Sequence, residues 1–297
     1  MPVDNLDESR NDLSQAAKYQ ILEEQGFTVG RTIGSGSYAC VKIAYDNNKK
    51  MKVAIKIISK KKAPQEFIVK FLPREIDIVR NLNHVNLIEF YQAIETTSRY
   101  FLVMELSENG DLLDHLRKRK YVDEAQAGQW FSNLVDGMEY MHSKGVAHRD
   151  LKCENVLITS SNVLKVADFG FARIVRKQRG NDVMMSETYC GSFAYAAPEI
   201  LKGTPYDAFL SDVWSMGVVL FTMVFGKLPF DDSNHAKLLK MVQSRVVFPA
   251  KPSVSENCRV MISKILVRAN ERPTLAEMQR EPWYKAHSQS KHLRVQA

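Results

Sequence analysis

The stretch His148-Arg149-Asp150-Leu151-Lys152-Cys153-Glu154-Asn155 is followed, thirteen residues beyond Asn155, by Asp168-Phe169-Gly170. Asp150 offers a carboxylate that can accept a proton from a hydroxyl group, and Lys152 offers a positive charge suited to a phosphoryl oxygen. Asn155 and Asp168 carry oxygen ligands of the hard kind that Mg²⁺ prefers. A base, a cation and two metal ligands so close together in the chain suit phosphoryl transfer, in which positioning and charge neutralisation supply most of the catalysis.

Two short apolar runs lie between these loops, Val156–Ile158 and Leu164–Val166, on either side of the polar turn Ser160-Ser161-Asn162. Runs of this kind around a turn predict a β-hairpin. We therefore expect one small hairpin to present the base, the cation and both metal ligands.

A glycine-rich loop, Gly34-Ser35-Gly36-Ser37-Tyr38-Ala39, lies near the N-terminus between strand-like residues 27–33 and 42–45. In the dinucleotide-binding fold such a loop must open a helix, so the flanking strands argue against that fold. A glycine loop between two strands can instead lie over a triphosphate and donate backbone N–H groups to it. The third glycine position of the motif is Ala39, for which we expect changed loop mobility and retained binding.

The next predicted strand contains a lysine that faces the same way as a small residue. Val53, Ile55 and Ile57 alternate there with Ala54 and Lys56, so the two-residue period of a strand puts Ala54 and Lys56 on one shared face. That placement suits a lysine beneath a bound nucleotide, whereas the alternative is a lysine on the solvent surface.

In their order and spacing these motifs resemble those of the eukaryotic protein kinases, and kinase-like motifs continue to Ala197-Pro198-Glu199 and Arg272. The resemblance implies an α+β, bilobal protein kinase fold, with a small, mainly antiparallel β N-lobe that holds one key helix and a larger, mainly α C-lobe. Strings such as residues 71–76 and 194–199 look like the testis-specific serine kinase family of the calcium/calmodulin-dependent kinase group.

The resemblance also divides the chain. It implies a kinase domain of residues 27–284, made of an N-lobe (27–105), a hinge (105–111) and a C-lobe (112–284). We also expect a mobile N-terminal extension (1–26) before this domain and a basic tail (285–297) after it.

The resemblance assigns catalytic roles by position. Asp150 would be the base and Lys152 would neutralise the moving phosphoryl group, while Asn155 and Asp168 would bind Mg²⁺. Lys56 would hold the α- and β-phosphates of ATP. Its implied partner is Glu75, with Asp77 as the competitor, on a helix that we predict to begin near Leu72 with Pro73 in its first turn. Arg272 would pair with Glu199.

The implied ATP contacts come from the glycine loop, the strands after it, the hinge and the hairpin: Ile33, Gly34, Ser35, Gly36, Ser37, Tyr38, Ala39, Cys40, Val41, Ala54, Lys56, Met104, Glu105, Leu106, Asp111 and Leu157. Arg149, directly before the base, implies control by a phosphate in the activation segment, with Thr188 as the expected acceptor.

The implied substrate contacts are Asp111, Glu154 and Ser192, and the two acidic residues favour substrates with arginine before the acceptor. Phe193 departs from the proline that is usual in the family, in the loop that receives the residue after the acceptor. This departure bears on fine specificity and leaves the expected reaction unchanged.

Bulk composition sets the expected partners and location. The chain has 297 residues, of which 45% are hydrophobic and 25% charged, and a net charge of +7. The composition is ordinary for a soluble globular chain, and no base-reading motif accompanies the basic excess, so no nucleic-acid partner is expected. The apolar run 213–226 is shorter than a membrane span and is predicted to be a buried helix. With no signal-like segment in residues 1–10, we expect a cytoplasmic monomer that does not bind membranes.

The predicted function is ATP- and Mg-dependent transfer of the γ-phosphoryl group to Ser/Thr hydroxyls of protein substrates. Within the resemblance, Lys152 favours Ser/Thr specificity, because tyrosine kinases usually lack a lysine at this position. The resemblance adds a role in male germ-cell development. The alternative is a pseudokinase scaffold that binds nucleotide or partners without phosphotransfer, and a nucleotide-sensing switch is a third interpretation. Loss of the lysine, the base or the metal-binding aspartate would favour the scaffold, but Lys56, Asp150 and Asp168 are all present.

Overall fold

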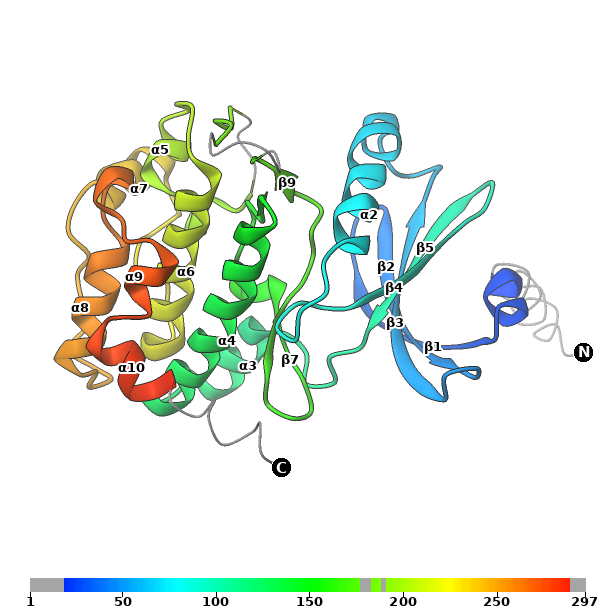
Figure 1. The fold of residues 1–297 in the computed structure, drawn as a ribbon, viewed down its shortest axis with the longest axis horizontal. Helices are drawn as coiled ribbons and strands as arrows, with labels where there is room; N and C mark the ends of the chain where they lie inside the picture. The colour runs from blue at the N-terminus through cyan, green and yellow to red at the C-terminus, as the bar shows by residue number, and fades with distance from the viewer. Residues whose placement is uncertain (1–18, 177–182, 188–190, 289–297) are drawn as a thin grey trace, which may run out of the picture. The chain divides into compact units, whose positions relative to one another are not determined.

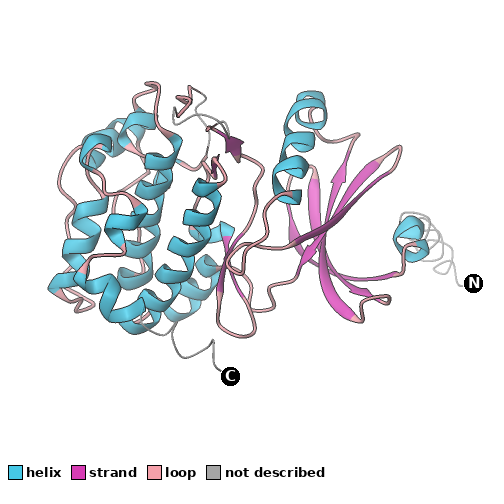
Figure 2. Cartoon of the chain, in the orientation of Figure 1, coloured by secondary structure: helices cyan, strands magenta, loops and turns pink. Residues whose placement is uncertain are grey.

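The computed structural model describes residues 19–176, 183–187 and 191–288. Contacts between Cα atoms divide the chain into two compact units, residues 1–70 with 89–106 and residues 71–88 with 107–297. Strands predominate in the first unit and helices in the second, as the colours of Figure 2 show. The α+β fold class predicted from the sequence is confirmed.

The first unit is built on a five-stranded antiparallel sheet with the order β1-β2-β3-β5-β4 (Figure 1). Its strands are β1 (Phe27–Ser35), β2 (Ala39–Asp46), β3 (Met51–Ser59), β4 (Phe90–Glu95) and β5 (Arg99–Glu105). Strand β3 pairs with β2 on one side and with β5 on the other. The strand that carries Lys56 therefore lies in the middle of the sheet.

One face of this sheet is apolar and buried. Val53, Ile55 and Ile57 of β3 pack there in one cluster with Tyr19 and Leu22, which belong to a short helix at residues 19–24. Because successive side chains of a strand point to opposite faces, Ala54 and Lys56 lie on the other face, as their alternation with the apolar residues predicted.

Helix α2 (Leu72–Arg80) lies at the start of the second unit, directly after the π-helical turn η1 (Phe67–Phe71). Pro73 occupies its first turn, where a helix needs no N–H donor, so the predicted start is confirmed. Glu75 is buried, with 5% of its surface exposed, whereas Asp77 is exposed. Of the two candidate carboxylates, Glu75 is thus the one on the packed side of the helix.

The rest of the second unit is mainly helical. Its helices are α3 (Leu112–Arg119), α4 (Glu124–Ser143), α5 (Pro198–Leu201), α6 (Ala208–Phe225), α7 (His235–Val242), α8 (Glu256–Ile265), α9 (Leu275–Met278) and α10 (Pro282–Ser288), with 3₁₀ turns η2 (Cys153–Asn155), η3 (Phe193–Tyr195) and η4 (Ala269–Glu271). Short strands pair as β6 (Val146–Ala147) with β9 (Arg173–Ile174), and as β7 (Val156–Ile158) with β8 (Leu164–Val166). The predicted hairpin of β7 and β8 is confirmed.

Helix α6 forms the centre of this unit. In the described part of the chain it is the one helix long and apolar enough to cross a membrane, with a mean hydropathy of 1.7, but 83% of it is buried inside the fold. The prediction of a core helix is confirmed. Asp207 caps its N-terminus by accepting from the Phe209 and Leu210 N–H groups, and Gly226 ends it in the left-handed conformation with φ of 69°.

Candidate active site

The backbone before the predicted base is held by a buried carboxylate of α6. Asp212 is 1% exposed, and its two oxygens accept from the His148 N–H at 2.9 Å and the Arg149 N–H at 2.8 Å. His142 Nε2 lies 3.0 Å from the same carboxylate. These contacts stabilise Arg149 in the positive-φ region, at 67°, which side chains rarely adopt. Sequence reasoning missed this role, although a carboxylate at the head of an apolar helix was its visible signal.

The carboxylate of Asp150 is oriented at both of its oxygens. Oδ2 accepts from Lys152 Nζ at 2.9 Å and from Asn155 Nδ2 at 3.3 Å. Oδ1 accepts from the Ser192 N–H at 3.0 Å and from its hydroxyl at 3.2 Å. Lys152 Nζ also donates to Ser192 Oγ at 2.9 Å. The structure therefore brings together the predicted base, the predicted cation and a predicted substrate-binding serine.

The two predicted metal ligands lie beside this base. The side-chain amide of Asn155 donates to the backbone carbonyl oxygen of Asp150 at 2.8 Å. The backbone carbonyl oxygen of Asn155 accepts from the Ala167 N–H at 2.8 Å, so Asp168, the next residue, lies near Asn155. The donor contacts of the Asn155 amide leave its side-chain oxygen as the group for a cation. In the described residues no three His, Cys, Asp or Glu side chains gather as a metal site. Two oxygen ligands fit Mg²⁺, which usually takes its remaining ligands from phosphates and water.

Glu75 lies beside the loop of Asp168-Phe169-Gly170. A Cβ atom at Gly170 would lie 3.5 Å from Asp168 Oδ1 and 3.6 Å from Glu75 Oε2, so both carboxylates face that glycine. The ring of Phe169 packs against the ring of His148 with centroids 5.7 Å apart. The predicted metal-binding loop therefore lies beside Glu75 of α2 and beside His148 of the predicted catalytic loop, within the second unit.

Five of the nucleotide-binding residues predicted in the first unit share one face of the sheet. Val41 is the register partner of both Gly34 and Lys56, and Ala54 is the partner of Met104. Residues paired across strands, and residues two apart on one strand, point to the same face. A continuous surface of small and apolar residues with one lysine thus runs from β1 to β5.

The glycine loop closes in a short turn in which the Gly36 N–H donates to the Ala39 carbonyl oxygen at 2.8 Å. Ala39 already pairs with Ile58 as the first residue of β2 and is not among the residues with positive φ, so its backbone does not require glycine. Cys40 differs from Val41, because its side chain packs against the buried cluster on the opposite face of the sheet. Only its backbone can contribute to the face that carries Lys56.

Glu105, Leu157 and Asp111 are further predicted nucleotide contacts, the first in one unit and the other two in the second. The Glu105 N–H donates to the Glu89 carbonyl oxygen at 2.8 Å, which holds the backbone at the end of β5. In the second unit, Leu157 of β7 forms a bridge with Asp111, whose carboxylate caps α3 by accepting from the Asp114 N–H at 2.8 Å.

Glu154, one of the two acidic residues predicted to contact substrates, directly follows the buried Cys153 in the chain. Burial raises the pKa of this thiol to about 12, and the negative charges of Glu154 and Asp111 raise it further. The exposed ring of Phe193 packs edge-on against His235 with centroids 5.8 Å apart. Acidic and aromatic groups are thus available at the surface of the second unit.

The predicted phosphate receptor is a buried arginine. Arg149 is 7% exposed, and its Nε donates to the Phe171 carbonyl oxygen at 2.8 Å. Its Nη1 atom is buried without a hydrogen-bond partner among the described residues. Thr188, the expected acceptor of the phosphate, lies outside the described residues.

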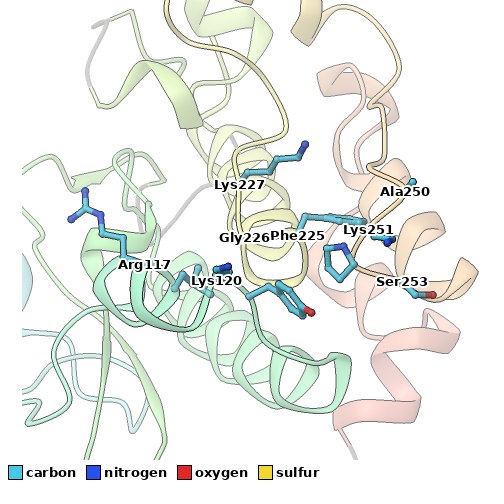
Figure 3. A pocket seen from close by; sticks show the side chains of 11 residues that line it. Arg117, Lys120, Phe225, Gly226, Lys227, Ala250, Lys251 and Ser253 are labelled. Atoms are coloured by element: carbon cyan, nitrogen blue, oxygen red, sulfur yellow. The ribbon is translucent and has the colours of Figure 1, made fainter.

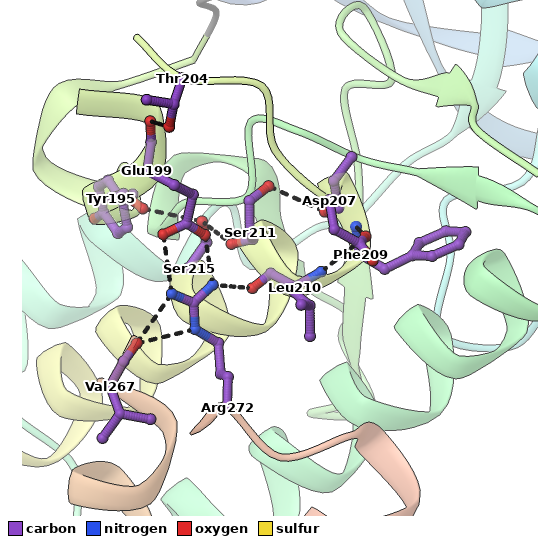
Figure 4. Close-up of polar contacts among 11 residues, drawn as sticks. Tyr195, Glu199, Thr204, Asp207, Phe209, Leu210, Ser211, Ser215, Val267 and Arg272 are labelled. Carbon is purple, nitrogen blue, oxygen red and sulfur yellow. Dashed lines mark hydrogen bonds and ion pairs between the residues drawn. The ribbon is translucent and has the colours of Figure 1, made fainter. Parts of the chain in front are cut away.

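The predicted pair of Arg272 and Glu199 is confirmed (Figure 4). The guanidinium donates to both carboxylate oxygens of Glu199, at 2.8 and 3.2 Å, and to the carbonyl oxygens of Leu210 at 2.6 Å and Val267 at 3.0 Å. The same group lies over the ring of Trp214, 5.2 Å from its centroid. This network ties the segment after the predicted substrate loop to α6.

A sheet with a glycine-rich loop and a carboxylate held beside a lysine, next to a short hairpin flanked by Asn155 and Asp168, suit phosphoryl transfer. A family model described as the protein kinase domain matches residues 27–284. The chain belongs to the protein kinase family and is a protein serine/threonine kinase.

Its similarity to particular relatives extends over most of its length. It is 45% identical to the human testis-specific serine/threonine-protein kinase 4 over 278 residues, which are 90% of this chain and 85% of the relative. It is also 45% identical to the mouse testis-specific serine/threonine-protein kinase 3, over 88% of this chain and 97% of the relative. The mouse testis-specific serine/threonine-protein kinase 1 is 42% identical over 83% of this chain and 68% of the relative. The resemblance to this kinase family found in the sequence is confirmed.

Proposed function

We propose that this kinase transfers the γ-phosphoryl group of ATP to Ser and Thr hydroxyls of protein substrates and uses Mg²⁺ as its divalent ion. Membership of the protein kinase family implies ATP and a divalent metal. The observation that carries the proposal is the carboxylate of Asp150, held at both oxygens between Lys152 and Ser192. A scaffold that transfers nothing has no need of a base oriented in this way.

Each residue has a separate task in the proposed reaction. Asp150 orients the acceptor hydroxyl and takes its proton, help that is typically worth about 10²–10⁴-fold, and Lys152 neutralises charge on the moving phosphoryl group. Asn155 and Asp168 would hold Mg²⁺, which supplies charge neutralisation on the ATP phosphates when bound. Lys56, with Glu75 as its proposed partner, holds the α- and β-phosphates.

The decisive test is transfer of ³²P from labelled ATP to a serine peptide that contains arginine. Incorporation is expected with Mg²⁺ and not with EDTA. The pseudokinase alternative would be favoured if nucleotide bound but no label were transferred, even after Thr188 had been phosphorylated by another kinase.

We further propose that Asp111 and Glu154 select substrates with arginine before the acceptor. The double variant Asp111→Asn, Glu154→Gln is expected to raise the KM for an arginine-containing peptide by roughly tenfold, because each lost carboxylate removes a charge-assisted hydrogen bond. Asparagine still caps a helix, so α3 keeps its N-terminus. The KM for a matched peptide with alanine in place of arginine is the control, and an unchanged preference on a peptide array would refute the proposal.

Phosphorylation of Thr188 is proposed to activate the enzyme through Arg149, whose Nη1 atom is buried without a partner among the described residues. Thr188→Ala is expected to lower kcat/KM by about tenfold or more, while Thr188→Ser keeps a hydroxyl acceptor and activity. In an Arg149→Gln background the Thr188→Ala change should have little further effect, because the partner of the phosphate is already lost. Additive losses in the double variant would contradict the pairing.

A cytoplasmic location and a role in male germ cells are further proposals. They are supported by relatives named testis-specific kinases at 42–45% identity. Antibody staining of germ cells for this chain tests both, and staining confined to another tissue or compartment would contradict them.

A further inference from the structure

A pocket of about 840 Å³ lies in the second unit, away from the residues proposed for phosphotransfer. Its walls come from three separate segments: the end of α3 with the residues after it, the end of α6 with the residues after it, and residues 250–253. Gly226 makes this convergence possible, because a Cβ atom there would overlap the carbonyl oxygen of Lys120.

Four cations surround this pocket, and no carboxylate lines it. Arg117, Lys120, Lys227 and Lys251 are all exposed, and Figure 3 shows Arg117 and Lys251 at opposite sides of the view with Lys227 above them. Arg117 forms an exposed ion pair with Asp114 at 3.1 Å. For the three lysines, no ion pair with a described residue is present. The pocket therefore presents a positive surface that is mostly uncompensated.

The helix dipole accounts for only part of this charge. Arg117 lies in the last turn of α3 together with Lys118 and Arg119, where cations stabilise the helix C-terminus. Lys227 lies two residues beyond the end of α6, where the same reason applies, whereas Lys251 lies outside any helix. The pKa of His115 is lowered, first by burial and then by the charges of Arg119 and Lys118, as expected near a positive region.

The floor of the pocket is apolar. Leu116 and Phe225 are buried beneath it, and Tyr121 remains 46% exposed. An inorganic anion would fill only a small part of this volume and would gain nothing from the apolar floor. An occupant that matches both features is an extended peptide with several carboxylates around one apolar side chain.

We propose that this basic pocket, lined by Arg117, Lys120, Lys227 and Lys251, docks an acidic segment of protein substrates distant from the phosphoacceptor. The proposal rests on the proposed function in that the docked partner is a substrate of the kinase. Complementary charge at a surface site speeds encounter and selects partners. The pocket would therefore select substrates through a segment that is separate from the phosphorylated one.

Two measurements with the full chain test this site. The first is the fluorescence anisotropy of a labelled peptide of Glu and Asp around one Leu, without Ser or Thr. The second is kcat/KM for a serine peptide with and without that acidic segment attached through a flexible linker. Reversal of two charges, Lys227→Glu with Lys251→Glu, is expected to weaken peptide binding by about tenfold and to remove the gain from the acidic segment. Added salt should reduce the wild-type gain.

The matched control is Lys202→Glu with Lys285→Glu, which makes the same change of net charge at exposed lysines outside the pocket. Equal loss of binding in both double variants, or no loss in either, would overturn the proposal. Tighter wild-type binding to phosphatidylserine vesicles or to a DNA oligonucleotide than to the peptide would also overturn it. If neither peptide were phosphorylated, the proposed function would fail, while the anisotropy would still report on the pocket.

Discussion

Asp150→Asn is expected to lower kcat for transfer to a serine peptide by about 10²–10⁴-fold. An amide cannot take the proton of the acceptor hydroxyl at neutral pH. The geometry adds a second reason, because Lys152, Asn155 and Ser192 all donate hydrogen bonds to this carboxylate. In either orientation the amide N–H₂ of the variant would face a donor, so the loop should lose order as well as its base.

The control for this change is Asp114→Asn, which removes the same charge from an exposed position of α3. This variant should keep the wild-type rate, and both variants should bind ATP as the wild type does. A wild-type rate in Asp150→Asn, from a preparation free of other kinases, would show that another group accepts the proton.

Arg272→Ala is expected to destabilise the protein by about 3–5 kcal/mol, as is typical when one partner of a buried ion pair is removed. The Arg272 side chain is 0% exposed and that of Glu199 is 16% exposed. Its loss would leave the Glu199 carboxylate and two carbonyl oxygens without their donor, and a space beside the ring of Trp214. The melting temperature should fall by roughly 6–20 °C in differential scanning fluorimetry.

Two further variants separate the buried pair from a general effect of charge. Arg268→Ala, which removes an exposed arginine four residues away, should change stability by no more than about 0.5 kcal/mol. Arg272→Lys should be intermediate, because an ammonium group keeps the charge but not the bidentate geometry. Equal melting temperatures for Arg272→Ala and Arg268→Ala would show that the network contributes nothing.

The local parts of the site could be predicted from the sequence. The hairpin of β7 and β8 follows from two apolar runs around a polar turn, and the shared face of Ala54 and Lys56 follows from the period of a strand. The start of α2 follows from the position of Pro73. Each of these depends on neighbours within a few residues, so short-range patterns were enough.

The long-range parts could not be predicted in the same way. Asp212 supports the backbone of Arg149 from 63 residues away, and no local pattern reports which loop a buried carboxylate will bind. Ser192 was expected to contact substrate, but its hydrogen bonds to Asp150 from 42 residues away depend on tertiary folding. Cys40 was grouped with its neighbours in the loop, although its side chain lies on the opposite face of the sheet.

The short helix at residues 19–24 belongs to the buried core of the first unit, so it limits how far the N-terminus can be shortened. The family match begins at residue 27, yet Leu22 is 0% exposed and Tyr19 is 8% exposed within the same cluster as Val53 and Ile55. A chain shortened to the matched region would lose these two side chains and leave an apolar sheet face in water, and such patches promote association. The minimal autonomous form of this kinase should therefore start no later than Tyr19, although homology alone places its beginning eight residues further on.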